Sequence, residues 1–123
     1  MPNYAPLKKA GCVLVVVDIQ EKLLPAIHDF TSVLDRSLKM VTAAKALDVP
    51  MLFTQQYTKG LWPTHPAITG LLPEFSYLEK TTFNCFGAPG FDEALAKLEA
   101  KTLVLIGIET HICVCQTALE ALR

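Results

Sequence analysis

The sequence predicts a doubly wound, three-layer α/β fold of the Rossmann-like type, with a mainly parallel sheet and helices on both faces. Strand-like and helix-like segments alternate along the chain, as in sheets whose strands are connected by helices. Two strand-like segments, 12–17 and 102–107, are runs of branched apolar residues, typical of strands covered on both faces. The chain has 123 residues, of which 51% are hydrophobic, so one domain with a substantial core is expected.

The first half of the chain is expected to contain two strands and one long helix. The run at 12–17 forms the first strand, and Asp18 ends it. Apolar residues recur at helical spacing through 31–47, which predicts an amphipathic helix. A second short strand is expected at 51–54, and the stretch 55–66, which contains glycine and prolines, is expected to be a loop.

The second half is expected to add two strands and two helices. Residues 75–78 predict a short strand, and apolar positions in 91–98 behind two acidic residues predict a helix. The strand at 102–107 follows, and then a helix over 111–122. Right-handed crossovers place the carboxyl ends of all these strands at one edge of the sheet, where open α/β sheets bind ligands.

Composition limits the classes of partner. The net charge of −1 gives no positive excess for nucleic acid, and no apolar run approaches the roughly 20 residues that cross a bilayer. The four cysteines form no CxxC pair and no zinc spacing, and no export signal is present, so we expect free thiols and a cytoplasmic location. We divide the chain into an N-terminal arm, 1–10, and a single domain, 11–123.

Cys113 is the residue that most indicates chemistry. We expect Thr110 to be the N-cap of the last helix, which would put this thiol in the first helical turn. There the helix dipole and unpaired backbone N–H groups favour a thiolate and can hold an oxyanion. Packing as a small buried hydrophobe is the alternative, and it is the expected role of Cys115, on another helix face.

Asp18 and Lys80 follow strand-like segments whose ends lie at the same sheet edge as Cys113. A carboxylate can take the thiol proton and return it to a leaving group, and an ammonium stabilises both anions. We therefore expect the three side-chain tips within a few ångströms of one another, and we expect Lys80 and the helix to depress the pKa of Cys113. Taken singly, an aspartate after a strand more often caps a turn, and a lysine in such a segment is typically a solvated surface residue.

Three sequence blocks carry a family resemblance: VVDIQ at 16–20, EKTTF at 79–83 and GIETHICV at 107–114. The chain resembles the isochorismatase-like cysteine hydrolases from about residue 11 to its last residue. Through TQQYTKGL at 54–61 it is most similar to the subgroup of isochorismatase domain-containing proteins. The resemblance implies a catalytic triad made of Asp18, Lys80 and Cys113. It also implies a cis peptide between Ile108 and Glu109, which with Cys113 would aim backbone N–H groups at an oxyanion.

The function implied is that of a metal-independent cysteine hydrolase without a cofactor. It would cleave a small-molecule carbonyl substrate, preferably a C–N amide, through an acyl-enzyme on Cys113. One alternative is vinyl-ether hydrolysis, as in isochorismatase itself, with Asp18 as the acid. Another is a catalytically inactive or truncated protein whose role is association. A ribonuclease label carried by some members of the subgroup finds no support in a basic patch, a histidine pair or a phosphate loop.

Aromatic and polar residues near the expected edge are candidate walls of a substrate pocket, namely Gln20, Tyr57, Trp62, Phe83 and Phe86, with core packing as the alternative for the aromatic ones. Nicotinamidases of the superfamily bind a metal through an aspartate and two histidines after the second strand. Here that loop has only His65, so no metal site is expected. His111 and His28 are expected to be structural or peripheral.

Family members of this kind continue with further strand–helix units. We therefore expect 102–107 to be an exposed apolar edge, and we expect the helix at 111–122 to leave apolar residues uncovered. Such a surface favours a homo-oligomer formed through 102–123. The other explanation is a longer polypeptide, with the C-terminal part of the family domain missing from this chain.

Overall fold

The computed structural model describes residues 4–123, and the fold it shows is the expected α/β fold. Four parallel strands form one sheet in the order β3-β2-β1-β4. The strands are β1 Cys12–Val17, β2 Met51–Gln56, β3 Leu78–Lys80 and β4 Thr102–Gly107. The helices are α1 Phe30–Ala46, α2 Thr58–Leu61, α3 Pro66–Thr69, α4 Phe91–Lys97 and α5 Cys115–Ala121. Short 3-10 turns at Leu24–Ala26 and Cys85–Gly87, and a π turn at Thr110–Val114, complete the elements.

The central strand β1 organises the core. It pairs with β2 on one side and β4 on the other, so that Val15 lies between Leu52 and Leu105. All six of its residues are buried, which explains its unbroken apolar sequence. Successive side chains point to opposite faces. Leu14 and Val16 therefore join the core cluster on one face, and the alternate valines join the cluster on the other.

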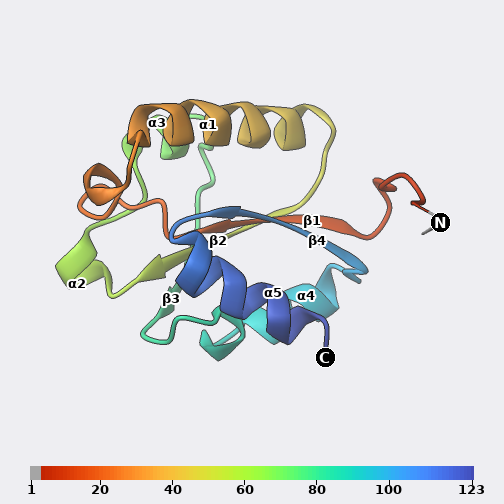
Figure 1. Cartoon of the computed structure of the whole chain (residues 1–123). Helices are drawn as coiled ribbons and strands as arrows, with labels where there is room; N and C mark the ends of the chain where they lie inside the picture. The colour runs from red at the N-terminus through yellow and green to blue at the C-terminus, as the bar shows by residue number, and fades with distance from the viewer. Residues whose placement is uncertain (1–3) are drawn as a thin grey trace.

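Helices cover both faces of the sheet. Figure 1 shows α1 and α3 on one side of the strands and α4 and α5 on the other. Val41 and Ala44 bring the apolar stripe of α1 onto the first face, as its helical spacing predicts. Phe91, at the start of α4, is fully buried in the second face. No helix within residues 4–123 has the length and apolar character needed to cross a membrane.

Three expected elements lie differently in the structure. The stretch 55–66, expected to be a loop, contains the last two residues of β2 and the short helix α2. The third strand is Leu78–Lys80 and not 75–78, because Phe75 instead packs edge-on against Phe53, with ring centroids 5.0 Å apart. The last helix does not begin with Thr110 as its N-cap. Glu109 precedes the first turn, Thr110 lies inside it, and that turn is a π turn. Of the expected arm, residues 1–3 lie outside the described residues, and residues 4–10 are exposed and form no helix or strand.

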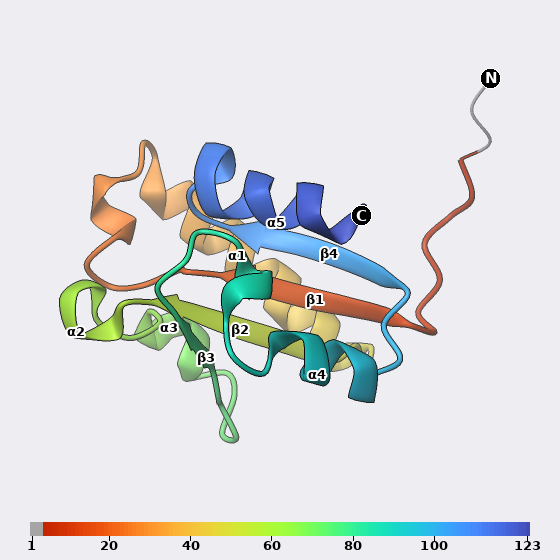
Figure 2. The same ribbon diagram turned by 90° about the horizontal axis from the view of Figure 1, so that it is seen from below.

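Strand β4 lies at one edge of the sheet, beside α5 (Figure 2). Among the described strands it pairs only with β1, and all of its residues are half-buried. A groove of about 630 Å³ runs along it between α4 and α5, and most of the side chains that line it are apolar. Leu122, directly after α5, lines this groove and is 86% exposed, and Leu119 on α5 is 62% exposed. The exposed apolar edge expected from the sequence is therefore present.

Candidate active site

The structure brings Asp18, Lys80 and Cys113 together at the carboxyl edge of the sheet. Asp18 directly follows β1, Lys80 is the last residue of β3, and Cys113 lies in the π turn after β4. Lys80 Nζ donates a hydrogen bond to Asp18 Oδ2 at 2.8 Å and lies 3.6 Å from Cys113 Sγ. The expected proximity of the three side chains is confirmed. Their exposed fractions are 0%, 1% and 6%, so the cluster is shielded from water.

The ammonium group of Lys80 is surrounded by acceptors. Besides Asp18, it donates to Gln56 Oε1 at 2.7 Å and to the backbone oxygens of Thr82 and Phe83 at 3.0 and 3.1 Å. A buried cation is tolerated only when it is paired and hydrogen-bonded in this way. Lys80 is therefore a fixed charge between the carboxylate and the thiol, and the alternative of a solvated lysine is excluded.

Two buried threonines, which sequence reasoning missed, hold the Asp18 carboxylate and the backbone of Cys113. Thr54 Oγ1 donates to Asp18 Oδ1 at 2.9 Å, while the other carboxylate oxygen faces Lys80. Thr117 Oγ1 donates to the backbone oxygen of Cys113 at 2.7 Å and accepts from the backbone N–H of Cys85 at 2.9 Å. Both threonines are buried, but single threonines in a strand and a helix give no sequence signal of such a role.

The expected depression of the Cys113 pKa is wrong. Burial, followed by the hydrogen-bonding and charge effects of Asp18, raises the pKa of this thiol to about 11, whereas Lys80 acts in the opposite direction without prevailing. The reason is that removal from water disfavours the thiolate more than one nearby cation favours it. Burial also raises the pKa of Cys85, whose Sγ lies 3.8 Å from Thr54 Oγ1. Cys113 is accordingly a neutral thiol at rest.

We predict that alkylation of Cys113 by iodoacetamide keeps accelerating as the pH rises from 9 toward 11. Only the thiolate reacts, and its fraction increases until the pH passes the raised pKa. The rate is measured by mass mapping of the modified peptide in a Cys115→Ser background, because Cys115 is exposed and would react as well. A rate for Cys113 that levels off below pH 9 would contradict the raised pKa.

The candidate pocket residues differ in their exposure and in the groups that they contact. Tyr57, Trp62 and Phe83 are about half exposed, as residues at a site entrance can be. Phe86 packs edge-on against Phe91, at 4.9 Å between ring centroids, and lines the groove below β4. Gln20 is fully buried, and its amide bonds only to backbone atoms, which differs from its expected place in a pocket wall.

The backbone before Cys113 contains a cis peptide bond between Ile108 and Glu109, the position to which the family resemblance assigns it. The N–H of Ile108 already donates to the backbone oxygen of Val17 at 3.0 Å. Because this N–H is already bonded to the last residue of β1, it is not free to bind an oxyanion. An oxyanion would therefore have to be held by the N–H groups of Glu109 or Cys113.

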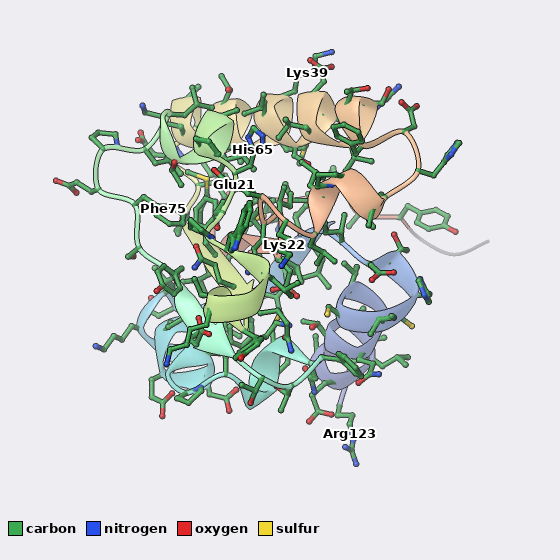
Figure 3. The ribbon with its side chains drawn as sticks, turned by 90° about the vertical axis from the view of Figure 1, so that its left-hand side faces the viewer. Glu21, Lys22, Lys39, His65, Phe75 and Arg123 are labelled. Atoms are coloured by element: carbon green, nitrogen blue, oxygen red, sulfur yellow. The ribbon has the colours of Figure 1, made fainter. Side chains whose placement is uncertain are left out.

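The histidines lie apart from this cluster. His65 caps α3, because its Nδ1 accepts a hydrogen bond from the N–H of Ala67 at 3.1 Å (Figure 3). His111 is exposed, with its Nε2 3.8 Å from Glu109 Oε2, and His28 is also exposed. Within residues 4–123, no three His, Cys, Asp or Glu side chains come together as a metal site. Cys115 is exposed, so its expected core position is wrong.

Comparison with known proteins agrees with this geometry. The family model described as the isochorismatase domain matches residues 12–123, which is most of the chain. The chain belongs to the isochorismatase family. Among curated relatives, isochorismatase domain-containing protein 2 of Danio rerio is 32% identical over 125 residues, covering 100% of this chain and 61% of that protein.

Two solved structures share the fold over nearly the whole chain. The MAR1 ribonuclease of Caenorhabditis elegans has a TM-score of 0.87 at 33% identity, covering 96% of this chain and 60% of that one. The YcaC gene product of Escherichia coli, described as an octameric hydrolase of unknown specificity, has a TM-score of 0.90 at 25% identity, covering 99% and 62%. The isochorismatase-family chain thus spans about three fifths of the length of these relatives.

Proposed function

We propose that this isochorismatase-family chain is a metal-independent cysteine hydrolase that cleaves a C–N amide of a small molecule. The observation that carries the proposal is the buried ammonium of Lys80, which contacts both Asp18 at 2.8 Å and Cys113 at 3.6 Å. An acid–base group, a nucleophile and a cation within hydrogen-bonding reach form the set that covalent acyl transfer requires. The family model and the hydrolase description of the bacterial neighbour support the same reaction class.

In the first half of the reaction, Cys113 Sγ attacks the carbonyl carbon while its proton passes to the Asp18 carboxylate. The C–S bond forms, and the carbonyl oxygen becomes an oxyanion that the backbone N–H groups of Glu109 and Cys113 hold. The C–N bond then breaks, and Asp18 returns the proton to the leaving amine. Lys80 contacts both groups, Asp18 at 2.8 Å and Cys113 at 3.6 Å, which supports a transfer between them within one buried cluster.

In the second half, water attacks the thioester of Cys113, and Asp18 takes one proton from that water. The C–S bond breaks, the carboxylic acid leaves, and the proton returns to the sulfur atom. Lys80 moves no proton in this scheme, because its ammonium protons are held by fixed acceptors. Its positive charge stabilises the thiolate as it forms, which offsets part of the cost of ionising a buried thiol.

A panel of small aliphatic and aromatic amides, assayed for release of the amine, tests the proposal. EDTA is present throughout, since the described residues form no cluster of metal ligands. Turnover of at least one amide that Cys113→Ala lacks supports the proposal. Turnover that appears only when EDTA is omitted and zinc is added would overturn the metal-independent mechanism. The ribonuclease description of the nematode neighbour finds no counterpart in the geometry of the histidines, because His65 caps a helix and His111 is exposed.

We also propose that the protein self-associates through β4 and α5, as the exposed edge strand and the apolar groove beside it suggest. We predict that light scattering on the 123-residue chain detects species larger than a monomer, and that Leu122→Glu shifts the population toward the monomer. Leu47→Glu, at an exposed leucine that does not line the groove, serves as the matched control and should change nothing. A monodisperse native monomer with sharp cooperative unfolding would contradict this proposal.

The cytoplasm is the location that we propose. The four cysteines are all free thiols in the structure, with Cys12, Cys85 and Cys113 buried and Cys115 exposed. Free thiols persist in reducing compartments, whereas secreted proteins of this size more often carry disulfides. Expression of the tagged natural protein followed by cell fractionation tests this assignment.

A further inference from the structure

The side chain of Gln20 continues the sheet beyond the end of β1. The strand stops at Val17, and Asp18 then adopts a left-handed backbone conformation with φ 55°. Two residues later, Gln20 Oε1 accepts from the N–H of Gln56 at 2.7 Å, and its Nε2 donates to the oxygen of Gln56 at 2.9 Å. Its second amide proton goes to the backbone oxygen of Trp62 at 2.7 Å. The buried amide thereby holds Gln56 as a neighbouring strand would.

Gln56, whose backbone Gln20 holds, contacts the ammonium of Lys80 with its own side chain. Gln56 Oε1 lies 2.7 Å from Lys80 Nζ, the shortest contact of that ammonium. An ammonium has three protons. At Lys80 these are shared among four oxygens and the sulfur of Cys113, so each acceptor competes with the others. The side-chain oxygen of Gln56 therefore influences how strongly the Lys80 ammonium interacts with the Cys113 thiol.

We infer that Gln56 is a positioning residue for Lys80, that Gln20 fixes it in place, and that the pair controls the reactivity of the Cys113 thiol. Gln56 touches neither the sulfur atom nor Asp18 by any hydrogen bond in the structure of residues 4–123, so it acts through Lys80. The catalytic meaning of the inference rests on the proposed role of Cys113 as the nucleophile. The contacts themselves, and the test below, involve the thiol alone and need no substrate.

The substitution Gln56→Glu tests the inference with a predicted sign. A glutamate has the same size and keeps the backbone that Gln20 holds, but it places a negative charge on Lys80. The added charge weakens the stabilisation of the Cys113 thiolate by Lys80, so a smaller fraction of the thiol is ionised. Cys113 should therefore be alkylated by iodoacetamide roughly tenfold more slowly at about pH 9. The rate is read by mass mapping in the Cys115→Ser background. The substitution Gln116→Glu adds the same charge at an exposed position on α5, and its rate should stay within about twofold of the native rate because water screens it.

A folded Gln56→Glu protein that is alkylated at the native rate would overturn the inference, and so would an equal slowing in Gln116→Glu. If Gln56→Glu does not fold, the neutral substitution Gln56→Met replaces it, and the measurement becomes the proton exchange of the Lys80 ammonium in ¹H–¹⁵N NMR spectra. Loss of one acceptor should accelerate that exchange severalfold. Gln55→Met is the matched control, since Gln55 bonds to Thr58 and Thr64 and not to Lys80. Unchanged exchange in Gln56→Met, or equal changes in both variants, would overturn the inference.

Failure of this inference and failure of the proposed function are distinguishable. Suppose that the native protein hydrolyses an amide and that Gln56→Glu does not change the alkylation rate of Cys113. The proposed hydrolase function would then be supported, and the proposed role of Gln56 would be rejected. Suppose instead that Gln56→Glu slows alkylation tenfold but the native protein hydrolyses none of the amides. The role of Gln56 would then be supported, and the proposed reaction would be rejected.

Discussion

Replacement of Cys113 by alanine is expected to lower kcat/KM on a cleaved amide by roughly 10³-fold or more, because the variant has no atom that can form the proposed acyl intermediate. The fold should survive, since only one sulfur atom is removed from a small side chain, and the free energy of unfolding should fall by about 1 kcal/mol. The two quantities are measured by steady-state kinetics and by denaturant unfolding of the same preparation.

The control for this substitution is Cys115→Ala, which makes the same change two residues away at an exposed position. It should retain native activity. Full activity in Cys113→Ala would show that the thiol is not the nucleophile. Acid catalysis by Asp18, of the kind that cleaves a vinyl ether, would then be the better account of the buried cluster.

The substitution Asp18→Asn is expected to have the largest effect on stability as well as a large effect on activity. The carboxylate of Asp18 is 0% exposed and pairs with Lys80 at 2.8 Å, so its replacement leaves a buried cation without its counter-charge. Breaking one partner of a buried pair typically costs about 3–5 kcal/mol. Activity should fall by roughly 10²–10⁴-fold, because the group proposed to accept the thiol proton is gone. Denaturant unfolding and amide turnover measure the two effects.

The matched control is Asp35→Asn, which breaks a pair with Lys39 of similar length, 3.0 Å, on the exposed surface of α1. Water screens that pair, so the free energy of unfolding should change by less than about 1 kcal/mol and activity should not change. Equal stability changes in the two variants would mean that the buried pair with Lys80 does not hold the site together.

Local patterns in the sequence were sufficient to predict most of the fold. The two long apolar runs became β1 and β4 with the bounds expected, because their side chains face helices on both sides. The helix at α4 also lies within one residue of its expected end, since its apolar spacing and acidic first turn are local signals. The parallel direction of the strands then placed Asp18, Lys80 and Cys113 at one edge of the sheet.

The remaining features depend on contacts between residues far apart in the sequence. The third strand was misplaced because the position of Phe75 is decided by its packing on Phe53. The hydrogen bonds between the Gln20 side chain and the backbone of Gln56 join residues 36 positions apart, which no local pattern can reveal. The direction of the Cys113 pKa was wrong for the same reason: the nearby charge is visible in the sequence, but the degree of burial is not.

Mass spectrometry of the protein, quenched with acid during turnover of an amide, locates the acyl group on the chain. We predict a mass increase equal to the acyl portion, mapped to Cys113 and absent from Cys113→Ala, while the exposed thiol of Cys115 stays unmodified. An acyl group mapped to another residue, or product formed by Cys113→Ala at the native rate, would contradict this prediction.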